Sequence, residues 1–168
     1  MRIRRYFFAV AAFLMIFYGC LSEEKSKNTN PHILFILVDD LGWADLGYTG
    51  SKYYETPNID KLAASGMVFT DAYAASPICS PSRAAIMTGK YPARLNLTDY
   101  IPGNRHHGPH KDQKLASHPF NLQLNLEEYT IAEAFKDADY NTFFAGKWHI
   151  GEEEKYYPHH QGFDINKG

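Results

Sequence analysis

The apolar residues of the chain fall into short runs that predict the strands of a buried sheet. The run His32–Val38 is almost continuously apolar, and it ends at the acidic pair Asp39–Asp40. A run without polar alternation is typical of a strand covered on both faces, as in a parallel sheet. Met67–Tyr73 is a weaker strand candidate, and Tyr140–Ala145 predicts a further strand.

Helix signals fall between these runs. Thr56–Pro57 supplies a cap and a first-turn proline, and Gly66 ends the helix that they begin. A second helix is predicted through Ser82–Met87, and Thr130 and Glu133 form a capping box for a third. The apolar positions expected to face the core are Ile59, Leu62 and Ala63 in the first helix and Ile131, Ala134, Phe135 and Ala138 in the third.

The alternation of strands and helices predicts an α/β fold with a mainly parallel sheet flanked by helices. Ligands in such folds bind beyond the carboxyl ends of the strands. Asp39–Asp40 and Lys147–His149 follow two of the predicted strands, so we expect them to lie at a common site. Residues 91–125 have few periodic signals and predict a long irregular segment.

Residues 1–19 predict a leader rather than part of the fold. Basic residues precede the apolar run Tyr6–Phe17, which is too short to span a bilayer comfortably. Phe17–Cys20 resembles a bacterial lipobox, in which Cys20 becomes the lipid-anchored N-terminus. An ordinary signal peptide cut nearby is the alternative. Both interpretations predict export, and the lipobox predicts a lipoprotein of the bacterial cell envelope, in the periplasm or outer membrane.

Residues 20–30 predict a polar tether, and residues 31–168 the remaining domain. The net charge of −2 becomes −5 when the three arginines of the leader are removed, which argues against a nucleic-acid binder. An apolar content of 45% is typical of a globular protein. We expect no disulfide, because Cys20 and Cys79 have separate predicted roles.

The segment Pro77–Gly89 holds the strongest chemical signal. Cys79 lies at the mouth of the second predicted helix, where unpaired N–H groups and the helix dipole favour an anionic centre. Pro81 suits the first turn, and the guanidinium of Arg83 can reach back toward residue 79. This combination favours a nucleophile that acts on an anionic substrate, whereas a small buried apolar cysteine is the alternative.

The order Cys-x-Pro-x-Arg, with Thr-Gly at its end, resembles the signature of the sulfatase family. The resemblance implies an alkaline-phosphatase-like fold. It also implies that a maturation enzyme oxidises Cys79 to formylglycine, whose hydrate is the nucleophile, and that Arg83 steadies residue 79.

Asp39 and Asp40 are adjacent carboxylates that would repel each other without a compensating cation. A hard divalent ion with oxygen ligands would compensate them, and a solvated turn is the alternative. Leu37–Gly42 resembles the N-terminal strand of sulfatases. That resemblance implies that Asp39, Asp40 and the modified Cys79 bind one calcium ion.

Lys147 and His149 are two residues apart, so in an extended backbone their side chains face the same way. They could grip an oxyanion, and the imidazole could move a proton, whereas an exposed strand face is the alternative. Tyr140–His149 resembles the second sulfatase signature, which implies that Lys147 and His149 contact the sulfate. Asp139 departs from the glycine with which that signature usually begins.

A cationic loop follows the first signature, and its basic residues are Arg105, His106, His107, His110 and Lys111. The loop is either a solvated surface or a pocket wall that attracts an anionic substrate.

The resemblance covers about residues 31–168 and implies a sulfuric ester hydrolase acting on a sulfated small molecule or glycan. The alternatives are a phosphonate or phosphate ester hydrolase of the same superfamily and a non-catalytic remnant that binds sulfated glycans. Sulfatases continue well past the second signature, and the other calcium ligands, a histidine and a lysine lie in that later part. We therefore expect a truncated, N-terminal part of a sulfatase domain that is nearly inactive alone.

Overall fold

The structure is a computed structural model that describes residues 30–102, 114 and 118–168. It separates into two units, residues 1–38 and residues 39–168. The predicted leader, the lipobox at Cys20, the tether up to residue 29 and the cationic loop 105–111 lie outside the described residues. Among the described residues, no helix has both the length and the apolar character that a membrane span requires.

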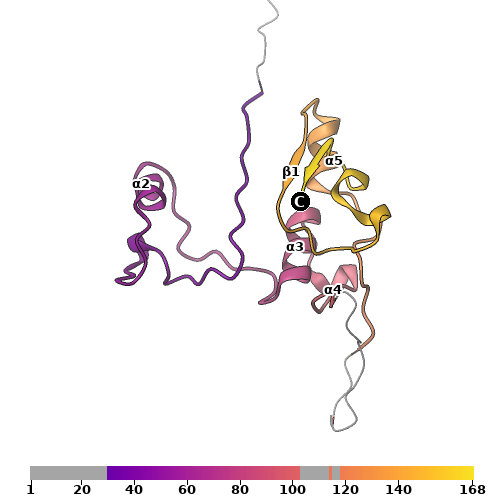
Figure 1. Cartoon of the computed structure of the whole chain (residues 1–168), viewed down its shortest axis with the longest axis horizontal. Helices are drawn as coiled ribbons and strands as arrows, with labels where there is room; N and C mark the ends of the chain where they lie inside the picture. Colours follow the sequence, from indigo (N-terminus) through magenta and orange to yellow (C-terminus); the bar gives the residue numbers. More distant parts are fainter. Residues whose placement is uncertain (1–29, 103–113, 115–117) are drawn as a thin grey trace, which may run out of the picture. The chain divides into compact units, whose positions relative to one another are not determined.

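The second unit contains short helices and one small sheet (Figure 1). The α-helices are α2 (Pro57–Ser65), α3 (Cys79–Thr88), α4 (Pro92–Leu95) and α5 (Ile131–Asp137). The 3-10 helices are η1 (Gly47–Thr49), η2 (Glu154–Tyr156) and η3 (Pro158–His160), and the strands are β1 (Phe143–Ala145) and β2 (Ile165–Lys167).

The two strands pair in parallel, which agrees with the predicted sheet type. Phe143 pairs with Ile165 and Ala145 with Lys167. Thr142 fixes the start of the pair, because its N–H donates to Asp164 Oδ2 at 2.9 Å and its hydroxyl donates to the Gly162 carbonyl at 2.7 Å. β1 occupies only the end of the strand predicted over Tyr140–Ala145.

The strand prediction for His32–Val38 is wrong, and so is the weaker one for Met67–Tyr73. The described residues of both segments form no strand, and Leu34 is 84% exposed. An apolar run indicates that a segment can be buried, but a strand forms only where a neighbour accepts and donates ladder hydrogen bonds. The described strands β1 and β2 pair with each other.

Helix α3 (Cys79–Thr88) contains the segment predicted over Ser82–Met87, begins three residues before it and ends at Thr88, next to Gly89, as predicted. Ile78 is extended at its N-terminal boundary, and Gly89 ends it in the left-handed conformation (φ 66°), where its N–H donates to the Ala85 carbonyl at 2.8 Å. Glycine adopts this conformation without the steric cost that a side chain adds. The helix therefore places Cys79 at its first residue.

The capping box of α5 is also confirmed. Thr130 Oγ1 accepts from the Glu133 N–H at 3.2 Å, and Glu133 Oε2 accepts from the Thr130 N–H at 2.7 Å. The predicted apolar face is wrong, however, since Ala132 is buried while Ile131 is exposed. Thr130 is itself buried and donates to the Gln161 carbonyl. With Thr130 held there, Ala132 faces the interior in place of Ile131.

Helix α2 has the predicted bounds but a different cap and face. The Thr56 hydroxyl donates to Asp60 Oδ1 at 2.8 Å instead of capping the backbone. None of the helix residues is buried, so the predicted stripe of Ile59, Leu62 and Ala63 does not form a core face.

The core lies where α3, α4 and the segments around them meet. Ala84 comes from α3 and Leu95 from α4, and both pack with residues of the irregular segments. The full cluster is Ala84, Leu95, Leu97, Ile101, Leu124 and Ile150, with Met87 and Trp148 packed against it. This core supports the helix that carries Cys79 and the segment that carries His149.

Candidate active site

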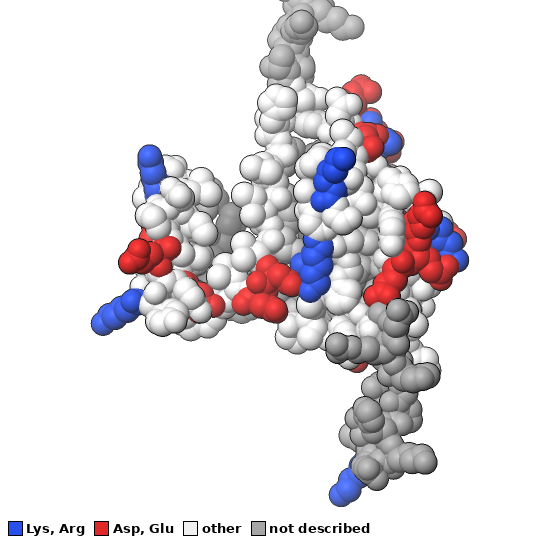
Figure 2. Space-filling view, in the orientation of Figure 1, with Lys and Arg blue, Asp and Glu red and all other residues white. Residues whose placement is uncertain are grey.

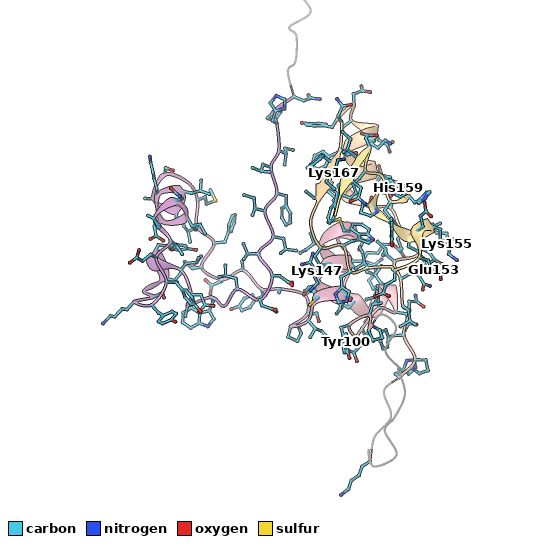
Figure 3. The ribbon with its side chains drawn as sticks, viewed as in Figure 1. Tyr100, Lys147, Glu153, Lys155, His159 and Lys167 are labelled. Carbon is cyan, nitrogen blue, oxygen red and sulfur yellow. The ribbon has the colours of Figure 1, made fainter. Side chains whose placement is uncertain are left out.

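Cys79 and Lys147 lie side by side. Lys147 Nζ donates to Cys79 Sγ at 3.3 Å, and the thiol is half-buried at the start of α3. Lys147 belongs to the loop that follows β1, and Figure 3 labels it beside α3. Lys147, which follows the carboxyl end of β1, thus lies next to the first residue of α3, as expected for a site at the carboxyl ends of the strands.

Asp39 bridges two cations of the site. Its Oδ2 accepts from Lys147 Nζ at 2.7 Å, and its Oδ1 accepts from Arg83 Nη2 at 2.9 Å. The hydrogen bond from Lys147, followed by that from Arg83, lowers the pKa of Asp39 below its ordinary value of 3.8. The bond to Asp39 is also the main reason that the pKa of Lys147 is raised.

Arg83 is the buried member of the group, with 8% of its surface exposed. Its Nη1 donates to the Lys147 carbonyl while Nη2 holds Asp39, so one guanidinium connects three segments of the chain. Its Nε is buried and finds no partner among the described residues. A planar, permanently charged fork suits this task better than an ammonium would.

Aromatic packing holds the Lys147 loop. The Trp148 ring lies 5.2 Å from the Phe144 ring and 6.1 Å from the Phe163 ring, measured between centroids. The indole N–H donates to the Tyr156 carbonyl at 2.9 Å. Trp148 is thus held by ring packing and by its indole hydrogen bond. Because Trp148 follows Lys147 directly, these contacts also fix the position of the Lys147 backbone.

His149 lies outside the hydrogen-bonded group of Cys79, Asp39, Arg83 and Lys147. Its Nε2 contacts the Ile101 carbonyl at 2.7 Å, and its buried Nδ1 finds no partner among the described residues. The backbone there is left-handed (φ 58°), so the extended geometry expected for this segment is wrong. His149 and Lys147 nevertheless line one pocket of about 400 Å³.

Asp40 is not a member of this hydrogen-bonded group. It is exposed, its φ is 55°, and it forms no hydrogen bond with another described residue. Among the described residues, no group of three or more His, Cys, Asp and Glu side chains is placed to hold a metal ion. Two carboxylates are suitable ligands for calcium but supply fewer than the six to eight oxygens it usually takes.

Two residues near the site were not predicted from the sequence. Ser80 Oγ accepts from the Ile101 N–H at 2.9 Å, and the carbonyl of that same residue contacts His149. The only sequence signal for this contact was a hydroxyl residue directly after Cys79. Ile101 gives no signal, because it contributes its backbone N–H and carbonyl and not its side chain.

The charges of the described residues are mixed. On the face shown in Figure 2, basic and acidic side chains are interspersed and no extended basic patch forms. This distribution gives no support to a nucleic-acid interface, which would need clustered lysine and arginine.

The sulfatase family model matches residues 31–165. This match covers most of the chain, which therefore belongs to the sulfatase family. The fold agrees with it, since Cys79 at the start of a helix contacts Lys147, which follows a strand. The chain is 40% identical to the N-acetylgalactosamine-6-sulfatase of Canis lupus familiaris over 135 residues, which cover 80% of this chain and 24% of that protein.

Two further relatives extend the comparison. Arylsulfatase G of Canis lupus familiaris is 36% identical over 159 residues, which cover 90% of this chain and 27% of that protein. The crystal structure of Ps i-CgsB in complex with k-i-k-neocarrahexaose aligns with a TM-score of 0.64 and 36% identity, covering 77% of this chain and 27% of that one. The chain thus spans about a quarter of the length of these curated relatives.

Proposed function

We propose that this chain supplies the nucleophile part of a sulfatase active site that hydrolyses sulfate esters. The observation that carries the proposal is the contact of Lys147 Nζ with both Cys79 Sγ and Asp39 Oδ2, at 3.3 and 2.7 Å. A cation that lies next to residue 79 can stabilise the negative charge of a sulfate held there.

Cys79 is proposed to be oxidised to formylglycine by a maturation enzyme. The hydrated aldehyde would supply one oxygen that displaces the alcohol from sulfur and a second hydroxyl whose deprotonation then expels sulfate and restores the aldehyde. Arg83 holds the Lys147 backbone and the Asp39 carboxylate, and these two contacts keep the Lys147 ammonium next to residue 79. A neutral His149 that donates through Nε2 has Nδ1 as its basic nitrogen for proton transfer.

Calcium is proposed as the metal, with Asp39, Asp40 and residue 79 among its ligands and the others outside the described residues. When bound, it would polarise the sulfate oxygens. The side-chain cations that form ion pairs with Asp39 are Lys147 and Arg83.

A sulfated glycan is the proposed substrate class. The relatives named N-acetylgalactosamine-6-sulfatase and the carbohydrate complex of Ps i-CgsB support it. The pocket beside Lys147 also has aromatic and polar lining residues that suit a sugar, namely Trp148, His149, Glu152, Tyr157 and Asn166. We further propose export, with a lipid anchor at Cys20, as the leader indicates.

The test is an assay of matched nitrophenyl sulfate and nitrophenyl phosphate after co-expression with a formylglycine-generating enzyme. Because the chain covers a quarter of its relatives, residues 31–165 are assayed within a chimera. There they replace the matching segment of the canine N-acetylgalactosamine-6-sulfatase. Preferential cleavage of the sulfate supports the proposal. Preferential cleavage of the phosphate favours a phosphate ester hydrolase, and an unmodified Cys79 after co-expression favours a remnant that only binds sulfated glycans.

A further inference from the structure

Ser80 follows Cys79 in the first turn of α3 and is completely buried. Its hydroxyl oxygen accepts from the Ile101 N–H at 2.9 Å, across a sequence separation of 21 residues. Ile101 is a core residue, so its N–H has no access to water and needs an acceptor within the protein. Ser80 therefore fixes the backbone of Ile101 against the helix that carries residue 79.

The carbonyl group of Ile101, which belongs to the next peptide unit, contacts the imidazole. His149 Nε2 lies 2.7 Å from the Ile101 carbonyl oxygen. A carbonyl oxygen can only accept, so Nε2 carries the proton in this bond and, in the neutral ring, Nδ1 carries the lone pair. The buried Nδ1 has no competing partner among the described residues.

The backbone of His149 is held from its own side as well. Its left-handed φ of 58° is unfavourable for a residue with a side chain, so the surrounding structure must maintain it. The next residue, Ile150, is completely buried, and its carbonyl accepts from the Leu124 N–H at 2.8 Å. The main chain around His149 therefore fixes the position of the imidazole, and the carbonyl oxygen of Ile101 favours the tautomer with the proton on Nε2.

We propose that Ser80 is a positioning residue, which sets the tautomer and orientation of His149 through the backbone of Ile101. The hydroxyl next to the nucleophile and the histidine of the second signature are thereby joined through the main chain of one residue, Ile101. The consequence for catalysis rests on the proposed function, in which His149 needs a free basic nitrogen. The tautomer itself does not depend on that function.

The tautomer can be measured by ¹⁵N NMR of the imidazoles in the full 168-residue chain, at a pH where His149 is neutral. Its signals are assigned by their loss in a His149→Gln variant. We expect the protonated-Nε2 tautomer to dominate in the unaltered chain. In Ser80→Ala, the ratio of this tautomer to the protonated-Nδ1 form should fall about fivefold, the effect of weakening one ordinary hydrogen bond.

Ser82→Ala is the matched control, because Ser82 lies in the same helix and its hydroxyl donates to the Ser76 carbonyl, away from Ile101. This control should leave the ratio unchanged. If Ser80→Ala does not fold, Ser80→Cys preserves the side-chain volume and offers only a weak acceptor. The proposal is overturned if Nδ1 carries the proton in the unaltered chain, or if the ratio stays constant in the folded Ser80 variant. Either result is independent of sulfate hydrolysis, and a failed sulfatase assay would leave the measured tautomer intact.

Discussion

Lys147 donates to the Asp39 carboxylate at 2.7 Å although 108 positions separate the two residues in the chain. The same ammonium contacts Cys79, so one charge serves both the first residue of the Asp39–Asp40 pair and the candidate nucleophile. The pair is partly exposed, with side-chain exposures of 42% and 38%, and water screens its attraction. Its position beside Cys79 is therefore more important than its contribution to stability.

Replacing Lys147 by methionine should separate these two effects. The free energy of unfolding should fall by no more than about 1 kcal/mol, because exposed ion pairs contribute little. The pKa of Asp39 should rise toward its ordinary value of 3.8, because the hydrogen bond from Lys147 is the largest cause of its depression. Sulfate release by the matured chimera should fall by about a hundredfold or more. Denaturant unfolding, carboxyl NMR titration and the sulfate assay measure the three quantities.

Lys155→Met is the control for this substitution, since Lys155 pairs with Glu153 at an exposed position away from the site. It should change neither the Asp39 pKa nor the sulfate release. An Asp39 pKa that is the same in Lys147→Met as in the unaltered chain would show that the Lys147–Asp39 contact is not formed in solution, because Arg83 alone would then account for the depression.

Arg83→Ala should destabilise the chain by about 2 kcal/mol, because it removes a buried charged donor that serves both Asp39 and the Lys147 carbonyl. Arg83→Lys should recover only part of this loss, because an ammonium cannot reproduce the fork that spans both acceptors. Arg94 is exposed on α4, and its replacement by alanine should have almost no effect on unfolding by denaturant. Equal losses for Arg83→Ala and Arg94→Ala would contradict the buried role.

Asp164 should make the start of the sheet sensitive to acid. The Lys136 ammonium, followed by the N–H and the hydroxyl of Thr142, lowers the pKa of Asp164 from 3.8 to about 2. A depressed carboxyl pKa adds stability above the unfolded value, and this contribution is lost as the pH falls from 3.8 to about 2. The stability difference between the unaltered chain and Asp164→Asn should therefore shrink over that range in denaturant titrations. Glu152→Gln, an exposed acidic control, should show a constant difference, and a constant difference for Asp164→Asn would refute the assignment.

Thr130→Ala should reduce the free energy of unfolding by about 1–2 kcal/mol, because it removes the N-cap of α5. The substitution also removes the buried hydrogen bond to the Gln161 carbonyl. Thr130→Ser retains the hydroxyl for both contacts and should preserve most of the stability. Comparable losses in the two variants, measured by denaturant unfolding, would assign the effect to the methyl group instead.

Local signals predicted the local structure well. The first-turn proline and terminal glycine gave the limits of α3, and Thr130 with Glu133 gave a capping box, because these features depend on residues a few positions apart. The parallel pairing of strands also followed from the alternation of elements. The strand expected at His32–Val38 did not form, because hydrophobicity does not specify a hydrogen-bonding neighbour.

The site was predictable where side-chain chemistry marks it. Cys79, Asp39, Arg83 and Lys147 all stood out in the sequence, and the structure joins them in one hydrogen-bonded group. The left-handed backbone at Asp40 and at His149 was not indicated by the sequence pattern. The link from Ser80 through Ile101 uses a main-chain group, which any residue type could supply, so no side-chain motif could reveal it.

The central claim is that residue 79, once matured, attacks the sulfur of a sulfate ester. The most direct measurement is sulfate release from nitrophenyl sulfate by the chimera that carries residues 31–165, with conversion of residue 79 quantified by peptide mass spectrometry. We expect release in proportion to the converted fraction, none in Cys79→Ala, and little from the 168-residue chain alone. A folded chimera with residue 79 fully converted that releases no more sulfate than Cys79→Ala would contradict the claim.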